Sequence, residues 1–192
     1  MLSPVTFDVS LRDIFVPLLS GGTLCVPDYE SSHNPTRLLQ WLKDKHMTLI
    51  HIVPTLFRML TRTIEDVNTD EPALPDLRSV LIAGEPLYWN DVINWRKADG
   101  NRTELVNLYG PSETTLAKCY FRIKDGTFKS EEIVPIGKPI PETEVFIIEN
   151  NTACSMGETG ELYIRTPFMS HGYYDDTELN RVAFVQNPLV KD

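Results

Sequence analysis

The chain has 192 residues and a formal net charge of −9, with 42% hydrophobic and 23% charged residues. These proportions are ordinary for a globular protein and exclude disordered, coiled-coil and collagen-like chains. The acidic residues are scattered and leave no basic face for nucleic acid. No apolar stretch approaches the roughly 18 residues that a membrane span needs, and no leader-like pattern opens the chain. We therefore expect a soluble cytoplasmic protein without nucleic-acid or membrane partners.

The first part of the chain alternates helical and strand patterns. In order, these patterns predict a helix over 8–19, a strand over 23–26, a helix over 34–46, a strand over 48–53, a helix over 54–64, an acidic loop over 65–76, a strand over 79–83, a helix over 89–97 and a strand over 103–108. Such alternation favours a parallel sheet with flanking helices. Since ligands bind beyond the carboxyl ends of such strands, we expect the loops after Val53, Ala83 and Leu108 to form one site.

Beyond Thr115 the pattern changes to strands over 116–123, 144–149 and 161–165, followed by a helix over 177–183. We therefore expect an α/β subdomain over 1–122 that carries the binding pockets. A smaller, incomplete β-rich portion, part of a barrel, would follow over 123–192.

The three cysteines, Cys25, Cys119 and Cys154, are far apart and lack the spacing of metal ligands. A disulfide framework is therefore not expected, and we interpret each cysteine as a packed thiol.

The most informative stretch runs from Asn107 to Thr115, where an apolar strand meets Gly-Pro and then hydroxyl and carboxylate side chains. An amide and an aromatic ring can hold a flat base, whereas Ser112 and Glu113 can contact phosphate oxygens or Mg²⁺. The stretch therefore indicates nucleotide handling. The alternative is a simple turn in which Ser112 caps a short helix.

Residues 107–115, Asn-Leu-Tyr-Gly-Pro-Ser-Glu-Thr-Thr, resemble the Asn-x-Tyr-Gly-Pro-Thr-Glu-x-Thr motif of adenylate-forming enzymes, most closely that of amino-acid adenylation domains of nonribosomal peptide synthetases. Further segments fit the same family in the same order: Phe-Asp-Val-Ser at 7–10, Ala-Gly-Glu-Pro-Leu at 83–87, Gly-Glu-Leu-Tyr-Ile at 160–164, His-Gly-Tyr-Tyr at 171–174 and Glu-Leu at 178–179.

The resemblance implies a fragment of the large N-terminal part of such an enzyme, which activates an amino acid with ATP and Mg²⁺ as aminoacyl-AMP. The implied partners are the amino acid, a peptidyl carrier protein bearing phosphopantetheine, and a condensation domain of the parent synthetase.

By similarity, Tyr109 stacks on adenine and Asn107 bonds its edge, while the backbone of Gly84, Glu85 and Gly110 borders the nucleotide pocket. Ser112, where the family has Thr, contacts the α-phosphate. Glu113 binds Mg²⁺, and these last two residues are the expected catalytic ones.

Asp8 matches the family aspartate that pairs with the substrate's α-amino group. The other positions of the implied substrate pocket are Val9, Arg12, His51, Leu81, Ala83, Leu108, Leu116 and Ala117. Because a buried guanidinium needs a polar partner, Arg12 and His51 favour a polar substrate, either acidic or hydroxylated. The alternative is that Arg12 pairs with Asp8 or points to solvent.

Three parts of the family pattern are absent: a phosphate loop before Phe7, a ribose-binding Tyr-x-Thr-Gly-Asp motif after Lys191, and the small C-terminal domain with its catalytic lysine. We therefore expect the isolated chain to be inactive. Two other readings remain open, an acyl- or aryl-CoA ligase fragment and a non-catalytic specificity subdomain.

Overall fold

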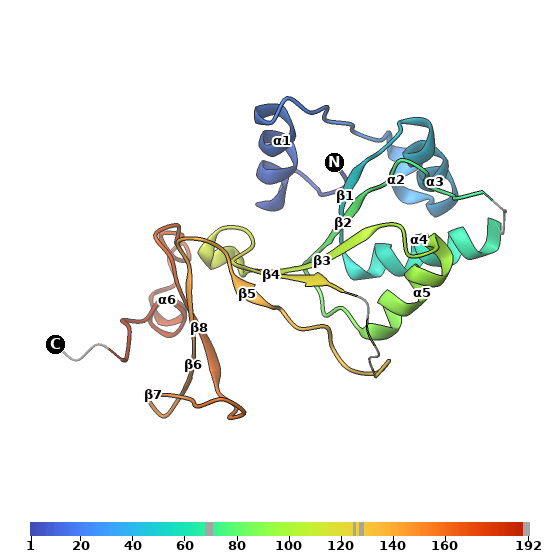
Figure 1. Cartoon of the computed structure of the whole chain (residues 1–192). Coiled ribbons are helices and arrows are strands. Elements are labelled where there is room, and N and C mark those ends of the chain that lie inside the picture. Colours follow the sequence, from blue (N-terminus) through green and yellow to red (C-terminus); the bar gives the residue numbers. More distant parts are fainter. Residues whose placement is uncertain (68–70, 125, 127–128, 190–192) are drawn as a thin grey trace. The chain divides into compact units, whose positions relative to one another are not determined.

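Figure 1 shows a computed structural model of the chain, which describes residues 1–67, 71–124, 126 and 129–189. Contacts divide the chain into two compact units. The first comprises Met1–Tyr109 and Cys119–Lys138, and the second comprises Gly110–Lys118 and Pro139–Asp192. The predicted division into domains at residue 122 stays a prediction.

The principal sheet has five strands in the order β1 (Leu49–Ile52), β2 (Ser79–Ile82), β3 (Glu104–Tyr109), β4 (Cys119–Ile123) and β5 (Lys138–Pro139). The first three strands are parallel, as the alternation of strand and helix predicts, whereas β4 runs antiparallel to β3.

The helices of the first unit are α1 (Val9–Leu19), α2 (Tyr29–His33), α3 (Pro35–Asp44), α4 (Pro54–Val67) and α5 (Trp89–Asp99). Local signals explain their ends. The Asn34 side chain accepts a hydrogen bond from Arg37 N at 3.1 Å and so caps α3, with Pro35 in its first turn. Gly100 closes α5 in the left-handed conformation, with φ of 68°.

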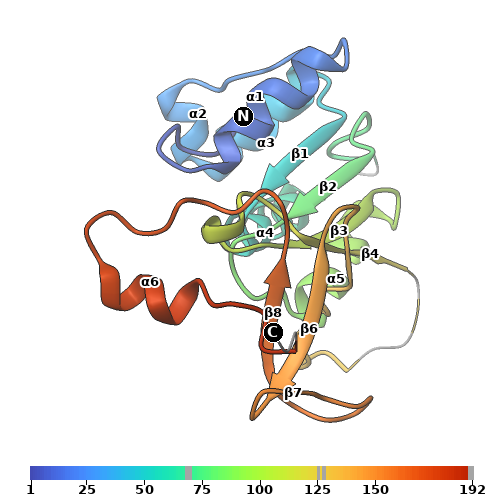
Figure 2. The ribbon, with the colours of Figure 1, turned by 90° about the vertical axis from the view of Figure 1, so that its left-hand side faces the viewer.

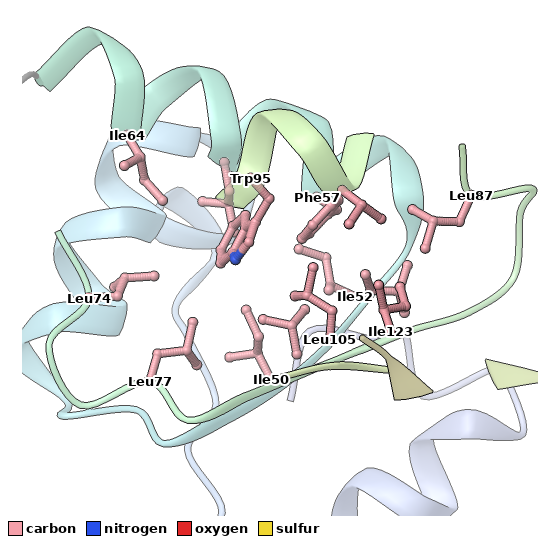
Figure 3. Packing of buried hydrophobic residues seen from close by; sticks show 14 of the residues in the cluster. Ile50, Ile52, Phe57, Ile64, Leu74, Leu77, Leu87, Trp95, Leu105 and Ile123 are labelled. Atoms are coloured by element: carbon pink, nitrogen blue, oxygen red, sulfur yellow. The ribbon is translucent and has the colours of Figure 1, made fainter. Parts of the chain in front are cut away.

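The core fills one face of the sheet, beneath α4 and α5 (Figure 3). Ile50, Val80 and Leu105 are aligned across β1, β2 and β3, and all three are buried. Above them, Phe57 of α4 stacks on Trp95 of α5 with ring centroids 4.7 Å apart. Because side chains alternate along a strand, this packing directs the intervening residues to the opposite face.

Helix α1 lies on that opposite face (Figures 1 and 2). The burial of its side chains is the reverse of the usual pattern. Its buried residues are Ser10 and Asp13, whereas Leu11, Phe15 and Leu19 are exposed. The predicted helix is therefore present, but it buries polar side chains.

Two predictions for the first unit need correction. No strand forms over residues 23–26, because this segment pairs with none of the described strands and Val26 stays exposed. Helix α2 was not predicted, although Asp28 caps it by accepting from Ser31 N at 2.8 Å. The predicted acidic loop over 65–76 starts later than expected, because α4 continues to Val67, and residues 68–70 lie outside the described part.

The second unit contains an open antiparallel sheet in the order β7 (Thr152–Ala153), β6 (Glu144–Glu149) and β8 (Glu161–Arg165), followed by α6 (Thr177–Ala183). It also contains the short 3₁₀ helix η1 (Ser112–Thr114). The strand predicted over 116–123 begins only at Cys119, because Thr115 and Leu116 both adopt positive φ.

Candidate functional site

The carboxyl ends of the parallel strands meet at one edge of the first unit's sheet. Ile52, Ile82 and Asn107 are aligned across β1, β2 and β3, so these three strands end side by side. That the loops after Val53, Ala83 and Leu108 form one site stays a prediction. A direct contact joins the start of α4 to the loop after β2, since Thr55 donates to Glu85 Oε2 from its hydroxyl at 2.7 Å and from its backbone N–H at 3.1 Å. The Glu85 carboxylate therefore caps the start of α4.

Gly84, just before Glu85, has a φ of 98°, which favours glycine. With the Glu85 side chain engaged on α4, the predicted contact of Gly84 and Glu85 with adenine would fall to their backbone atoms. That role stays a prediction.

Asn107 is buried, and two backbone carbonyl groups of a later segment, those of Val134 and Pro135, orient its amide group. Its Nδ2 donates to the carbonyl oxygens of Val134 at 3.3 Å and Pro135 at 3.0 Å. An amide nitrogen has two hydrogens, so these bonds use both donors and leave Oδ1 as the acceptor that could meet a ligand. Tyr109, at the end of β3, exposes 37% of its surface and offers an aromatic face.

In the second unit, residues 110–118 form a tightly folded loop. A Cβ on Gly110 would lie 2.1 Å from Leu116 O, so only glycine fits there. Lys118 is buried and donates from Nζ to Thr115 O at 2.6 Å, and burial lowers its pKa. Ser112 is exposed as the first residue of η1, whose N-cap is Pro111. The alternative in which Ser112 caps the helix is therefore wrong.

The carboxylate of Glu113 is held by Tyr173, whose hydroxyl donates a short hydrogen bond to Glu113 Oε1. This bond lowers the pKa of Glu113 and raises that of Tyr173, because it stabilises the ionised carboxylate and the neutral phenol. The backbone is tied as well, since Ser170 N donates to Glu113 O at 2.8 Å.

A second polar cluster lies between α1 and β1 in the first unit. Asp13 Oδ1 is 2.6 Å from His51 Nδ1 and 3.7 Å from Arg12 Nε, while Ser3 Oγ donates to Asp13 Oδ2 at 2.9 Å. The three ionisable side chains are largely buried, with 15% of Arg12, 4% of Asp13 and 12% of His51 exposed. Arg12 therefore does not point to solvent. Asp13 lies 3.7 Å from its Nε, and the charge of Asp8 acts on the guanidinium as well.

Burial shapes the ionisation of this cluster. Desolvation lowers the pKa of both Arg12 and His51, and the attraction of Asp13 offsets this only in part. Desolvation alone would raise the pKa of Asp13, but the hydrogen bonds from His51 and Ser3 and the nearby charges outweigh it and lower the value. Asp13 is therefore ionised and accepts, so we assign the proton on Nδ1 to His51 and leave Nε2 as an acceptor.

Two buried atoms of the cluster, Arg12 Nε and His51 Nε2, have no hydrogen-bond partner within the part of the chain that the structure describes. Arg12, Asp13, His51 and Leu81 all line a cavity of about 740 Å³. Three of the predicted pocket residues, Arg12, His51 and Leu81, therefore share one cavity.

The remaining predicted pocket positions are placed differently. Asp8, Val9, Ala83 and Leu108 lie in the first unit and are half-buried. The Asp8 residue already interacts with other groups of the chain. Leu116 and Ala117 belong to the second unit. Their contacts with a substrate stay predictions.

Sequence reasoning missed Asp13 and Tyr173. The position of Asp13 on a helix beside Arg12 is equally typical of a solvated face. Tyr173 is 60 positions from Glu113, and only its place in a family-like segment, residues 171–174, marked it.

Within residues 1–67, 71–124, 126 and 129–189, no group of three or more His, Cys, Asp or Glu side chains is arranged to hold a metal. A magnesium ion at Glu113 would therefore depend on this one carboxylate together with phosphate oxygens and water, which is a common arrangement for Mg²⁺. The donor chemistry of the loop fits such an ion.

Cys25, Cys119 and Cys154 are free thiols; Cys119 is buried, and burial raises its pKa, whereas Cys25 and Cys154 are half-buried. Over the same described residues, none of the helices has the length and apolar character needed to span a bilayer.

Comparison with known proteins identifies the family. The model of the family described as AMP-binding enzyme matches residues 1–174. The chain belongs to the AMP-binding enzyme family. It is 31% identical over 97% of its length to L-2-aminoadipate reductase of Schizosaccharomyces pombe and 30% identical over 98% to syringomycin synthase SyrB1 of Pseudomonas syringae pv. syringae.

Solved structures agree with this assignment to the AMP-binding enzymes. The nonribosomal peptide synthetase FmoA3, in an α-methyl-L-serine-AMP-bound form, matches with a TM-score of 0.86 and 27% identity over 97% of this chain. CmiS6 matches with a TM-score of 0.83 and 29% identity. The predicted fold class and the predicted resemblance are therefore confirmed.

These AMP-binding relatives are longer proteins. The chain spans 13% of the S. pombe reductase, 30% of SyrB1 and 21% of the FmoA3 chain.

Proposed function

We propose that the chain is part of an adenylation domain that selects an amino acid and activates it with ATP as aminoacyl-AMP. In this reaction the amino-acid carboxylate attacks the α-phosphate of ATP and pyrophosphate leaves. The parent protein would then transfer the aminoacyl group to a phosphopantetheine thiol on a carrier protein beside a condensation domain. The observation that carries the proposal is the stretch from the end of β3 into η1, where Asn107, Tyr109, Ser112 and Glu113 follow one another within a chain of this family.

Each of these residues has a chemical role in the proposal. Asn107 would accept from the amino group of adenine through Oδ1, because its two Nδ2 hydrogens are engaged. The ring of Tyr109 would stack on the base. Ser112 would donate to the α-phosphate, and Glu113 would hold the Mg²⁺ that supplies charge neutralisation when it is bound.

We further propose that the substrate carries a polar side chain, and that a hydroxyl suits the cavity best. Arg12 Nε can donate, whereas His51 Nε2, with the proton on Nδ1, can accept. A hydroxyl accepts from the first and donates to the second. A carboxylate satisfies only Arg12, whose charge Asp13 already offsets from 3.7 Å. An aliphatic side chain would leave both buried atoms unpaired, which costs about 1–3 kcal/mol for each.

Two relatives are named for polar amino acids. One is the aminoadipate reductase, and the other is the synthetase structure that holds an α-methyl-L-serine adenylate. They support a polar side chain without choosing between a carboxylate and a hydroxyl.

ATP–pyrophosphate exchange by the complete adenylation domain, measured against all common amino acids, tests the proposal. We expect exchange that depends on a hydroxylated or acidic amino acid. Exchange with leucine or phenylalanine alone would contradict the polar pocket, and exchange with fatty or aryl acids alone would support an acyl-CoA ligase instead. No exchange with any acid would favour a non-catalytic subdomain.

The isolated 192-residue chain provides a separate test. We expect its exchange rate to be negligible beside that of the complete domain, since the phosphate loop, the ribose-binding motif and the catalytic lysine of the family pattern are absent from it. Strong exchange by this chain alone would contradict the assignment of the chain as part of the site.

A further inference from the structure

The backbone around Glu113 is fixed from several sides within the second unit. Ser170 N donates to Glu113 O at 2.8 Å, and Ile140 N donates to Lys118 O at 2.9 Å at the end of the same loop. Inside the loop, Lys118 Nζ bonds Thr115 O at 2.6 Å. With its backbone held, the freedom that remains to Glu113 is the rotation of its side chain.

Tyr173 is the residue that removes this freedom. Its hydroxyl donates to Glu113 Oε1, and the backbone N–H of Glu113 also helps to stabilise the ionised carboxylate. A carboxylate whose orientation is fixed by such a hydrogen bond presents its remaining lone pairs to a cation in a defined direction.

Tyr173 is itself held in place by α6. Its backbone N–H donates to Asn180 Oδ1 at 2.7 Å, and Asn180 Nδ2 donates back to Tyr173 O at 2.9 Å. The ring meets Phe184 edge to face, with centroids 5.7 Å apart. Gly172 allows this approach, because a Cβ there would lie 2.5 Å from Asn180 Oδ1.

We propose that Tyr173 is a positioning residue for Glu113: its hydrogen bond to Oε1 fixes the orientation in which the carboxylate meets the cation. The inference rests on the proposed role of Glu113 as the magnesium ligand, and it assigns the segment from Gly172 to Asn180 as the support of that ligand. A purely structural tyrosine would pack its ring and have no effect on cation affinity.

The first experiment measures Mn²⁺ binding in the presence of ATP, by the electron paramagnetic resonance of free Mn²⁺, with the complete adenylation domain. Tyr173→Phe removes the hydroxyl and keeps the ring against Phe184. Tyr174→Phe is the matched control, because this neighbouring tyrosine is fully exposed, at 100% of its surface. Glu113→Gln reports the contribution of the carboxylate itself.

We expect Tyr173→Phe to weaken Mn²⁺ binding about tenfold, as the loss of a hydrogen-bond partner of a metal ligand typically does, and Tyr174→Phe to bind like the wild type. Equal binding by Tyr173→Phe and the wild type, with weaker binding by Glu113→Gln, would overturn the inference alone. Equal binding by Glu113→Gln and the wild type would overturn the proposed role of Glu113, and the inference with it.

The second experiment follows ATP–pyrophosphate exchange as a function of Mg²⁺ concentration. For Tyr173→Phe we expect a higher apparent KM for Mg²⁺, and a kcat that recovers at saturating Mg²⁺. A lower kcat at every Mg²⁺ concentration, with the KM unchanged, would indicate a structural role and overturn the inference. Asn180→Ala, which releases the backbone of Tyr173, should raise the same KM.

Discussion

Asp13 Oδ1 lies 2.6 Å from His51 Nδ1, and this contact joins α1 to the edge strand β1 across 38 positions of sequence. The apolar residues of α1 are largely exposed. The contact joins this helix to the face of the sheet that lies opposite the hydrophobic core. Much of the attachment of α1 is therefore polar, and it is expected to depend on pH.

Stability should fall as His51 becomes protonated. Its folded-state pKa is lowered, mainly by burial, from the ordinary value of 6.5, so the unfolded chain binds more protons in this range. The contribution is complete above about pH 6.5 and is lost as the pH falls toward the folded-state value. The lowered pKa of Asp13 adds a further loss below its ordinary value of 3.8. Thermal unfolding of the chain between about pH 8 and pH 5 measures the first loss.

His51→Gln should remove the part of this pH dependence that belongs to His51. His46→Gln is the matched control, because 80% of the His46 side chain is exposed. Parallel pH profiles for His51→Gln and the wild type would contradict a buried, neutral His51.

Arg12→Met should reduce the activity of the complete domain toward its preferred polar amino acid. Arg12 lines the cavity, and the methionine keeps much of its side-chain volume while removing its buried, unpartnered Nε–H donor. We expect kcat/KM for exchange with that amino acid to fall about 10- to 100-fold, which corresponds to about 1–3 kcal/mol. Arg37→Met, at an arginine whose side chain is 59% exposed, should leave it unchanged. Unchanged kcat/KM in Arg12→Met would rule out the contact between Arg12 and the substrate.

Glu113→Gln should lower turnover in the complete domain about 100-fold without unfolding it, because Mg²⁺ loses a charged ligand. The glutamine keeps an oxygen that can accept from Tyr173, so Tm should change little. Exchange kinetics together with thermal unfolding measure both effects. Glu178→Gln, on α6 with 88% of its side chain exposed, serves as the control and should turn over normally.

Gly110→Ala should destabilise the loop that carries Glu113. The added Cβ would lie 2.1 Å from Leu116 O and 2.7 Å from Ala117 Cα, so the backbone itself must move. We expect a loss of about 3 kcal/mol in the free energy of unfolding. At Gly157 the added Cβ meets nothing within 4 Å, and the cost of its positive φ is about 1 kcal/mol. Denaturant unfolding compares the two variants, and equal losses would show that the loop adapts.

Much of the fold could be predicted from the sequence because its signals are local. Asn34-Pro35 marks the start of α3, and short apolar runs mark β1, β2 and β3. Alternation of strand and helix then favours parallel pairing, which places the carboxyl ends of β1, β2 and β3 at one edge of the sheet. Hydrogen bonding and periodicity within a few residues are sufficient for these inferences.

The residues missed or misplaced depend on partners distant in the chain. Residues 23–26 have a strand-like composition, but a strand forms only when another strand pairs with it. The spacing of apolar residues in α1 predicts a helix but does not show which side of it packs against the sheet. In the structure Asp13 faces His51, while Leu19 is exposed.

The sequence by itself determined the resemblance to the family, the order of β1, β2 and β3, and the motif from Asn107 to Thr115, since each depends on residues that are consecutive or regularly spaced. Only the tertiary structure shows that Asn107 Nδ2 donates hydrogen bonds to the carbonyl oxygens of Val134 and Pro135, and that the Tyr173 hydroxyl donates to the carboxylate of Glu113. The physical reason is that a side-chain hydrogen bond needs both groups within about 3 Å. For residues 27 to 60 positions apart, only the folded backbone brings them that close.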